Sequence, residues 1–380
     1  MIPKILVVDD EPDLEILIKQ KFRKEIRDGK YNFVFAYNGV EALNKLVDDN
    51  EIELVLTDIN MPEMDGLTLL KKIKELNNPL LHSVIVSAYG DILNIRTAMN
   101  GGAFDFVVKP IDLNDLEITI NKAVTNLDTL KKALHVRDEL VLVQNELKEA
   151  RELQLSMLPK SEPKSENYDI SFYMQTASEV GGDYYDYLQN DDGSISIAIG
   201  DATGHGMPAG TMVSVMKGLF ISKSTQMSLE EFFTNSNRTI KHIDFKRMMM
   251  AFAIVEIHGN KVNYLNAGMP SLYIYKMKTD DVVEIESNNM PLGAIKETNF
   301  SSQEIDVESG DTLLLMSDGF PELKNSDSTM YSYERFTEKF RDVGKNSATE
   351  IIDLLKNESK SWSSSTDPDD DITFVVIKIK

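Results

Sequence analysis

The chain has 380 residues, of which 62 are acidic and 40 basic, so its formal net charge at pH 7 is -22. This length favours two or three domains. The acidic excess argues against nucleic acid as a partner, because phosphate binding needs clustered Lys and Arg. The chain has no cysteine, which excludes disulfides, thiolate metal sites and a cysteine nucleophile and fits a reducing cytoplasm. No apolar segment approaches the ~20 residues that a membrane span needs. We therefore expect a cytoplasmic protein with no membrane partner.

Residues 1–122 alternate between strand and helix patterns. Short apolar runs at residues 5–8, 33–36, 54–57, 83–87 and 104–108 predict strands, and a helical pattern follows each of them. Strict alternation of this kind predicts an α/β domain with a doubly wound, five-stranded parallel sheet. In such a sheet, ligands bind at the carboxyl ends of the strands.

Polar groups stand at the expected carboxyl ends. They are Asp9, Asp10, Asp58, Ser87 and Lys109. Three carboxylates close together repel one another unless a divalent cation such as Mg²⁺ is bound, and a nearby ammonium and hydroxyl can hold a phosphoryl group. The pattern therefore predicts a phosphoryl-accepting pocket with Asp58 as the nucleophile. Taken singly, each residue has a simpler explanation, such as a helix cap or a solvated charge; the joint spacing favours the pocket.

These residues resemble the receiver domain of two-component response regulators, over nearly all of residues 1–122. The matching motifs are residues 8–11, 57–66, 87–90 and 108–110. The resemblance implies that Asp58 accepts a phosphoryl group from a sensor histidine kinase, and that Asp9, Asp10 and Asp58 hold Mg²⁺. It also implies that Ser87 and Phe106 form a switch pair, that Lys109 contacts the phosphoryl group, and that the Lys109–Pro110 peptide bond is cis.

A helical linker is predicted to follow. Apolar residues recur at intervals of three and four from Leu113 to Leu134, and a second set from Val136 to Met157 keeps the heptad with a shifted phase. Such a shift is typical of a stammer in a coiled coil. We expect residues 123–158 to form a parallel coiled coil that makes a homodimer. The alternative is a single helix packed on one of the domains.

Residues 159–380 read as an α+β sandwich of β-sheets flanked by helices. Strand patterns occur at 170–175, 195–199, 251–257, 262–266, 272–275, 312–316 and 372–379, and helical patterns at 208–222, 229–240, 333–341 and 348–359. Acidic motifs at 181–183, 200–206, 317–319 and 369–373 adjoin strand patterns. Each alone is a common turn sequence.

Together, the acidic motifs predict a site for hard cations. Carboxylates without Cys and with few His favour Mg²⁺ or Mn²⁺. Two such ions that share a carboxylate would generate hydroxide near neutral pH and clamp a phosphate. His205 stands close to Asp201 and could be a general acid, although a residue of the Gly-rich turn is the simpler explanation.

Seven segments of residues 150–380 resemble metal-dependent PPM-type serine/threonine phosphatases of the bacterial sporulation stage II E and stress-regulator U branch. They are residues 153–159, 179–186, 200–206, 266–268, 291–293, 317–320 and 370–373. The resemblance implies two Mn²⁺ or Mg²⁺ ions bridged by Asp201. The other implied ligands are Asp183, Asp318, Asp370 and the carbonyl of Ala202, with Gly182 and Asp371 as secondary residues and Asp371 as the alternative to Asp370. Met269 departs from the His that the family often has there.

The combined resemblance implies a response regulator in which phosphorylation at Asp58 controls a protein serine/threonine phosphatase. The expected substrate is a phosphorylated anti-sigma-factor antagonist of the STAS type, and we hypothesise that the signal reaches the helix at 208–222. The alternative is a non-enzymatic adaptor that binds an anti-sigma or sigma factor in a phosphorylation-dependent way. Retention of all the acidic ligands counts against the adaptor.

Overall fold

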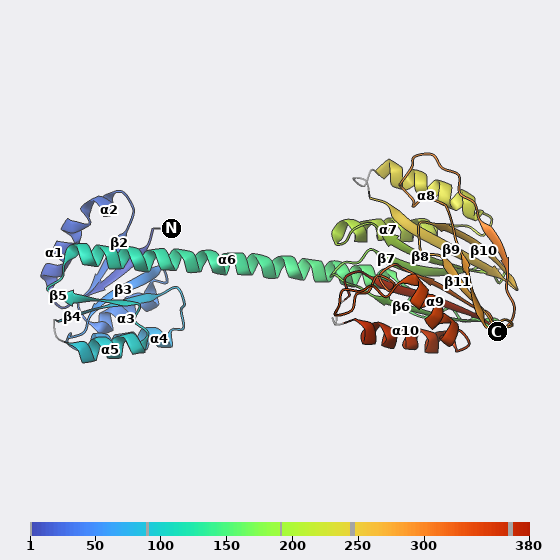
Figure 1. Ribbon diagram of the computed structural model, residues 1–380. Helices are drawn as coiled ribbons and strands as arrows, with labels where there is room; N and C mark the ends of the chain where they lie inside the picture. Colours follow the sequence, from blue (N-terminus) through green and yellow to red (C-terminus); the bar gives the residue numbers. More distant parts are fainter. Residues whose placement is uncertain (1, 89–90, 191, 244–247, 364–367) are drawn as a thin grey trace. The chain divides into compact units, whose positions relative to one another are not determined.

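The computed structural model describes residues 2–88, 91–190, 192–243, 248–363 and 368–380 (Figure 1). The chain divides into two compact units, Met1–Leu142 and Val143–Lys380. The division falls inside one continuous helix, α6 (Leu113–Met157), so the predicted domain boundaries at 122 and 158 stay predictions. Tyr89 and Gly90 of the predicted 87–90 motif lie outside the described residues. No helix in the described part of the chain is long and apolar enough to cross a membrane.

The N-terminal unit contains the predicted doubly wound sheet. Its strands pair in the order β2-β1-β3-β4-β5, and all four pairings are parallel. Helices on both faces bury the apolar strands, as this fold requires. The elements are β1 (Lys4–Val8), α1 (Pro12–Lys21), α2 (Arg23–Arg27), β2 (Asn32–Ala36), α3 (Gly39–Asp48), β3 (Ile52–Asp58), α4 (Gly66–Glu75), β4 (His82–Ala88), α5 (Ile92–Gly101) and β5 (Asp105–Lys109).

Helix α6 changes its surroundings along its length. Leu116, Ile120 and Ala123 are fully buried in the core on one face of the sheet, whereas Val136 and Leu140 are more than half exposed. The phase shift that the sequence predicts lies between these two stretches. The first apolar set therefore belongs to the N-terminal unit, and the second set begins where the helix no longer packs on that unit.

The C-terminal unit is the predicted sandwich of two antiparallel sheets. Their strand orders are β13-β10-β9-β8-β7 and β12-β11-β14-β15-β6. The strands are β6 (Tyr168–Gln175), β7 (Asp183–Gln189), β8 (Ile195–Ala202), β9 (Met250–His258), β10 (Lys261–Ala267), β11 (Leu272–Lys276), β12 (Asp281–Ile285), β13 (Gln303–Asp306), β14 (Thr312–Met316) and β15 (Ile372–Ile379).

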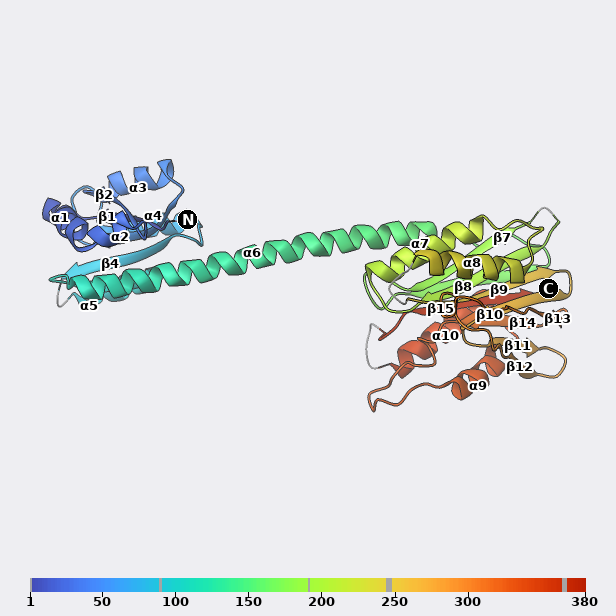
Figure 2. The same ribbon diagram turned by 90° about the horizontal axis from the view of Figure 1, so that it is seen from above.

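Four helices cover the outer faces of the two sheets, so the C-terminal unit has four layers. They are α7 (Met207–Ile221), α8 (Leu229–Ile243), α9 (Tyr333–Val343) and α10 (Ala348–Trp362). Figure 2 shows α7 and α8 over one sheet and α9 and α10 beyond the other. One apolar core lies between the sheets, a second under α7 and α8, and a third under α9 and α10. Alternate residues of the inner strands serve two cores at once, which explains their nearly continuous apolar sequences.

Three strands were missed from the sequence: β7, β12 and β13. All three lie at sheet edges. Edge strands pair on one side only and carry more polar and exposed residues, as β12 and β13 do. The β7 strand is different, because it buries two aspartates, Asp183 and Asp186. These acids hid its strand pattern.

Candidate active sites

The first site lies at the carboxyl edge of the parallel sheet, where β1, β3 and β5 end. Asp9, Asp10 and Asp58 each present a carboxylate oxygen, and these oxygens lie within 4.8 Å of one another. The Nζ atom of Lys109 donates to Oδ2 of Asp9 and Oδ2 of Asp58, each at 3.0 Å. The Lys109–Pro110 peptide bond is cis, as the resemblance implied.

Electrostatics in this pocket suit a cation and a phosphoryl group. Burial raises the pKa of Asp58 even though the Lys109 ammonium favours its charged form. For Lys109, hydrogen bonds to the two aspartates outweigh burial, and its pKa is raised. The Ser87 hydroxyl is buried without a hydrogen-bond partner among the described residues. A buried hydroxyl of this kind requires a partner, and a phosphoryl oxygen would be one. Phe106, the other predicted switch residue, is 38% exposed on β5.

The second site forms where β7 starts and β8 ends. Asp183 lies opposite Asp201 in the antiparallel register of these strands. The β14 strand ends just before Asp318, and β15 begins just after Asp370 and Asp371. The two β-sheets therefore bring the sequence-distant acidic motifs to one end of the sandwich.

Burial and neighbouring carboxylates raise the pKa of Asp201 and of Asp183 in this second site. Burial, followed by the charges of Asp318, Asp370 and Asp371, raises the pKa of Asp201 to about 7. Burial and Asp201 raise the pKa of Asp183 well above its ordinary range. No hydrogen bond from another described residue reaches the Asp201 side chain, so a bound cation is the partner that its environment leaves open. The donor set, made only of oxygen atoms, fits Mg²⁺ or Mn²⁺.

Two hydroxyl groups hold Asp183 in place. Its Oδ2 atom accepts hydrogen bonds from Ser317 Oγ at 2.7 Å and from Thr373 Oγ1 at 2.5 Å. Sequence reasoning assigned neither residue a role. Both stand inside motifs that it singled out, directly beside acidic residues, and that adjacency was the available signal. The two donors leave Oδ1 of Asp183 free for a cation.

Asp370 and Asp371 have different surroundings. Asp371 is 5% exposed, and its carboxylate accepts three backbone hydrogen bonds, from Ala177 and Gly182 at 2.7 Å each and from Asp183 at 3.3 Å. Among the described residues, the exposed Asp370 accepts one hydrogen bond, from the Asp371 amide at 2.8 Å. Asp371 thus braces the loop before β7, and the charge of Asp370 acts on Asp201 and Asp318.

Position 182 requires glycine because the backbone there lies close to Ala202 and Asp201. A Cβ atom there would lie 2.7 Å from the carbonyl oxygen of Ala202 and 3.2 Å from Oδ1 of Asp201. The Ala202 amide also donates to the Gly182 carbonyl at 3.0 Å. Any larger residue would push the β7 entrance away from the Ala202 carbonyl, the predicted backbone ligand.

The end of α6 is attached to the same loop. Gln154 is 7% exposed. Its Nε2 donates to the Gly181 carbonyl at 2.8 Å, and its Oε1 accepts from the Gly181 amide at 3.2 Å. Gln154 was placed in the linker heptad and inside a motif but was given no role. It connects α6 to the residue two positions before Asp183.

Two other residues were weighed from the sequence. His205 is exposed in the turn before α7. Met269 is buried, and its amide donates to Oδ1 of Asn266 at 2.8 Å. Met269, which stands where the family often has His, therefore lies in a tight turn that the Asn266 side chain closes.

The family model described as "Stage II sporulation protein E (SpoIIE)" matches residues 191–380, half of the chain. The "Response regulator receiver domain" model matches residues 5–121. The transcriptional regulatory protein ZraR of Escherichia coli (strain K12) is 35% identical over 126 residues, covering 33% of this chain and 27% of ZraR. Phosphoserine phosphatase RsbU of Bacillus subtilis (strain 168) is 26% identical over 185 residues, covering 48% of this chain and 55% of RsbU.

The chain thus spans about a quarter of ZraR and about half of RsbU. The SiaA-PP2C domain of Pseudomonas aeruginosa superposes with a TM-score of 0.57 at 18% identity, over 64% of this chain and 99% of that domain. This likeness shows that the C-terminal unit has the PP2C fold. The chain belongs to the stage II sporulation protein E family, and it carries a response regulator receiver domain ahead of the domain that defines that family.

Proposed function

We propose that the protein is a response regulator whose output is a metal-dependent protein serine/threonine phosphatase. One observation carries the proposal: acidic residues from four separate segments meet at one end of the sandwich, with Asp201 lacking any hydrogen-bond donor from another described residue. RsbU, which is named a phosphoserine phosphatase, matches over 48% of this chain. A phosphoserine or phosphothreonine in a partner protein is the corresponding substrate.

In this proposal two Mn²⁺ or Mg²⁺ ions would be held by Asp183, Asp201, Asp318, Asp370 and the Ala202 carbonyl. The ions would supply an activated water and neutralise charge on the phosphoryl group. The protein's own contribution is to hold the ligands in position. Ser317 and Thr373 fix Asp183, and Asp371 fixes the loop before it, so these supporting bonds would orient the ligands.

The receiver pocket supports phosphoryl transfer from a histidine kinase to Asp58. The Asp58 carboxylate oxygen attacks the phosphorus atom, the bond from phosphorus to the histidine nitrogen breaks, and the nitrogen keeps the electron pair. Asp9, Asp10 and Asp58 have the spacing to hold Mg²⁺. Lys109 then balances the added negative charge, and the Ser87 hydroxyl can donate to a phosphoryl oxygen.

Coupling between the two activities is proposed to run through α6. Val136, Leu140 and Val143 are each more than half exposed and keep heptad spacing, which favours a coiled-coil homodimer. The same helix ends with Gln154 bonded to Gly181. A change in the packing of α6 would therefore shift the loop that leads to Asp183, in addition to the α7 route that the sequence suggested. A phosphorylated STAS-type protein remains the proposed substrate.

Hydrolysis of a generic aryl phosphate with added Mn²⁺ tests the phosphatase. Asp201→Asn is expected to lower the rate by at least about a thousandfold, because the shared ligand loses its charge, while the fold is retained. Undiminished hydrolysis by this variant would overturn the metal assignment. Equal rates with and without a phosphoryl mimic on Asp58, in dimeric full-length protein, would refute the coupling.

A further inference from the structure

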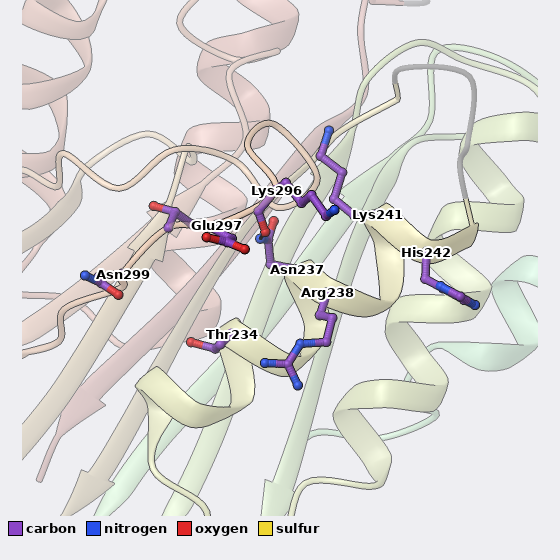
Figure 3. Close-up of a pocket in the computed structure, with 9 residues that line it drawn as sticks. Thr234, Asn237, Arg238, Lys241, His242, Lys296, Glu297 and Asn299 are labelled. Carbon is purple, nitrogen blue, oxygen red and sulfur yellow. Dashed lines mark hydrogen bonds between the residues drawn. The ribbon is translucent and has the colours of Figure 1, made fainter.

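A large cavity lies outside both sites, between the C-terminal half of α8 and the loop at residues 296–299. Its volume is about 1110 Å³. Figure 3 shows side chains from the helix on one side and from the loop on the other. The lining residues are Thr234, Asn237, Arg238, Lys241, His242, Lys296, Glu297, Thr298 and Asn299.

The lining is basic in a strongly acidic chain. Arg238, Lys241 and Lys296 carry permanent positive charges and His242 can carry another, whereas Glu297 is the one acidic residue among the described residues of the lining. All five side chains are exposed. Within the described part of the chain, none of the four basic side chains forms an ion pair. These cations are therefore available to an external anion.

The cavity is held in shape by a buried side chain. Asn237 is 3% exposed. Its Nδ2 donates to the Ile295 carbonyl at 3.0 Å, and its Oδ1 accepts from the Gly293 amide at 2.8 Å. These bonds attach the loop to α8, so the two basic walls keep a fixed separation without a ligand.

The same loop reaches the edge of the carboxylate site. Ala202 pairs with Met250 across β8 and β9. Met250 and Leu292 exchange backbone hydrogen bonds of 2.9 and 2.8 Å, and Leu292 immediately precedes Gly293. The wall of the cavity is therefore connected through two paired residues to the strand end that carries Asp201.

We propose that this cavity binds an acidic segment of the phosphoprotein substrate while its phosphorylated residue occupies the carboxylate site. The proposal rests on the proposed phosphatase function. Among the described residues, the lining contains no aromatic or aliphatic side chain on which a nucleobase could stack, which favours a peptide segment over a nucleotide. Positive charge beside the repelling carboxylates would also attract an acidic protein to the site.

The test compares two synthetic phosphoserine peptides with the full-length, Mn²⁺-loaded protein. One peptide carries Asp and Glu residues on both sides of the phosphoserine, and the other carries Asn and Gln instead. The wild type is expected to show about tenfold higher kcat/KM for the acidic peptide, the scale of two or three exposed ion pairs. The double variant Arg238→Glu/Lys241→Glu should lose this preference and retain wild-type hydrolysis of an aryl phosphate.

Lys345→Glu/Lys360→Glu is the matched control. Both lysines are exposed and lie in or next to α10, and the change in net charge is the same. This control should keep the preference for the acidic peptide. Absence of the preference in the wild type, its retention after reversal of Arg238 and Lys241, or its equal loss in the control would each overturn the proposal.

A binding measurement separates this proposal from the phosphatase assignment. Fluorescence anisotropy of a labelled acidic peptide without phosphoserine should report binding to the wild type and loss of binding in the Arg238→Glu/Lys241→Glu variant. If aryl phosphate hydrolysis is absent, the function fails, and the anisotropy result alone decides the cavity's role. Binding of ATP or of anionic lipid vesicles, with no binding of the peptide, would contradict the assignment to an acidic protein segment.

Discussion

Replacing the adjacent acids Asp370 and Asp371 one at a time by Asn should separate metal binding from loop bracing. The Asp371 carboxylate accepts hydrogen bonds from three backbone amides, and one of its two oxygens becomes an NH₂ donor in Asp371→Asn. At least one buried amide then loses its charged acceptor, which costs roughly 1.5–3 kcal/mol. Relief of repulsion with Asp183 and Asp201 offsets part of this loss. We expect a net loss of about 2 kcal/mol.

The single tryptophan, Trp362, makes the measurement selective. It lies in α10, packs edge-on against Tyr331 with ring centroids 5.3 Å apart, and donates to the Leu323 carbonyl at 3.0 Å. Thermal unfolding followed by tryptophan fluorescence therefore reports on the C-terminal unit. For a unit of this size, about 2 kcal/mol corresponds to roughly 4–8 °C in Tm.

Asp370→Asn is the matched comparison. Its carboxylate is exposed and accepts only one local amide bond, so the metal-free Tm should change by less than about 2 °C. Its Mn²⁺ affinity, measured by calorimetry, should fall at least about tenfold, because one charged ligand is lost. An unchanged Tm for Asp371→Asn, together with a loss of Mn²⁺ affinity in that variant alone, would exchange the roles of the two residues.

Three further predictions concern the same site. In metal-free protein, the free energy of unfolding of the C-terminal unit should fall as the pH rises from about 4 to about 7 and level off above that, because Asp201 has a folded pKa of about 7 against an ordinary 3.8 and only the folded state holds the proton between these values. Unfolding followed by tryptophan fluorescence should show this slope, and saturating Mn²⁺ should remove it. Thr373→Val should weaken Mn²⁺ binding about tenfold in calorimetry by removing a donor that favours the charged form of Asp183 and orients it. Unchanged affinity would count against this role. Gln154→Ala should lower the free energy of unfolding by about 1–3 kcal/mol, because the amide and the carbonyl of Gly181 both lose a buried partner. A change below about 0.5 kcal/mol in denaturant unfolding would show that water replaces the side chain.

Most of the acidic ligand candidates could be predicted because they adjoin an apolar strand pattern: Asp201 and Asp318 follow one, and Asp370 precedes one. Strand ends in layered folds meet at one edge, so sequence position alone predicted proximity. The residues that support them could not be assigned in this way. Ser317 and Thr373 are small hydroxyl residues with many ordinary roles, and their shared target, Asp183, opens a strand whose buried acids conceal the strand pattern.

The basic cavity illustrates a second limit. Arg238, Lys241 and His242 stand on one helix, but Lys296 is more than 50 positions away in the sequence, and the net charge of -22 argues against any basic surface. A net charge averages over the whole molecule. Local potential depends on which few charges the fold places together and on which of them have partners.

In helix α6, a change in the packing partner along the helix produces the same heptad phase shift as a stammer in a coiled coil. The positions of apolar residues on a helix depend on the surface that packs against them, and this surface changes along α6. Leu116 and Ile120 are buried in the core of the N-terminal unit, Val136 and Leu140 are exposed, and Gln154 is buried against Gly181. Each stretch of the helix therefore has its own phase, set by its own neighbour. The proposed coiled coil would then be confined to the exposed middle stretch, and both ends of the helix would keep their packing on their own units.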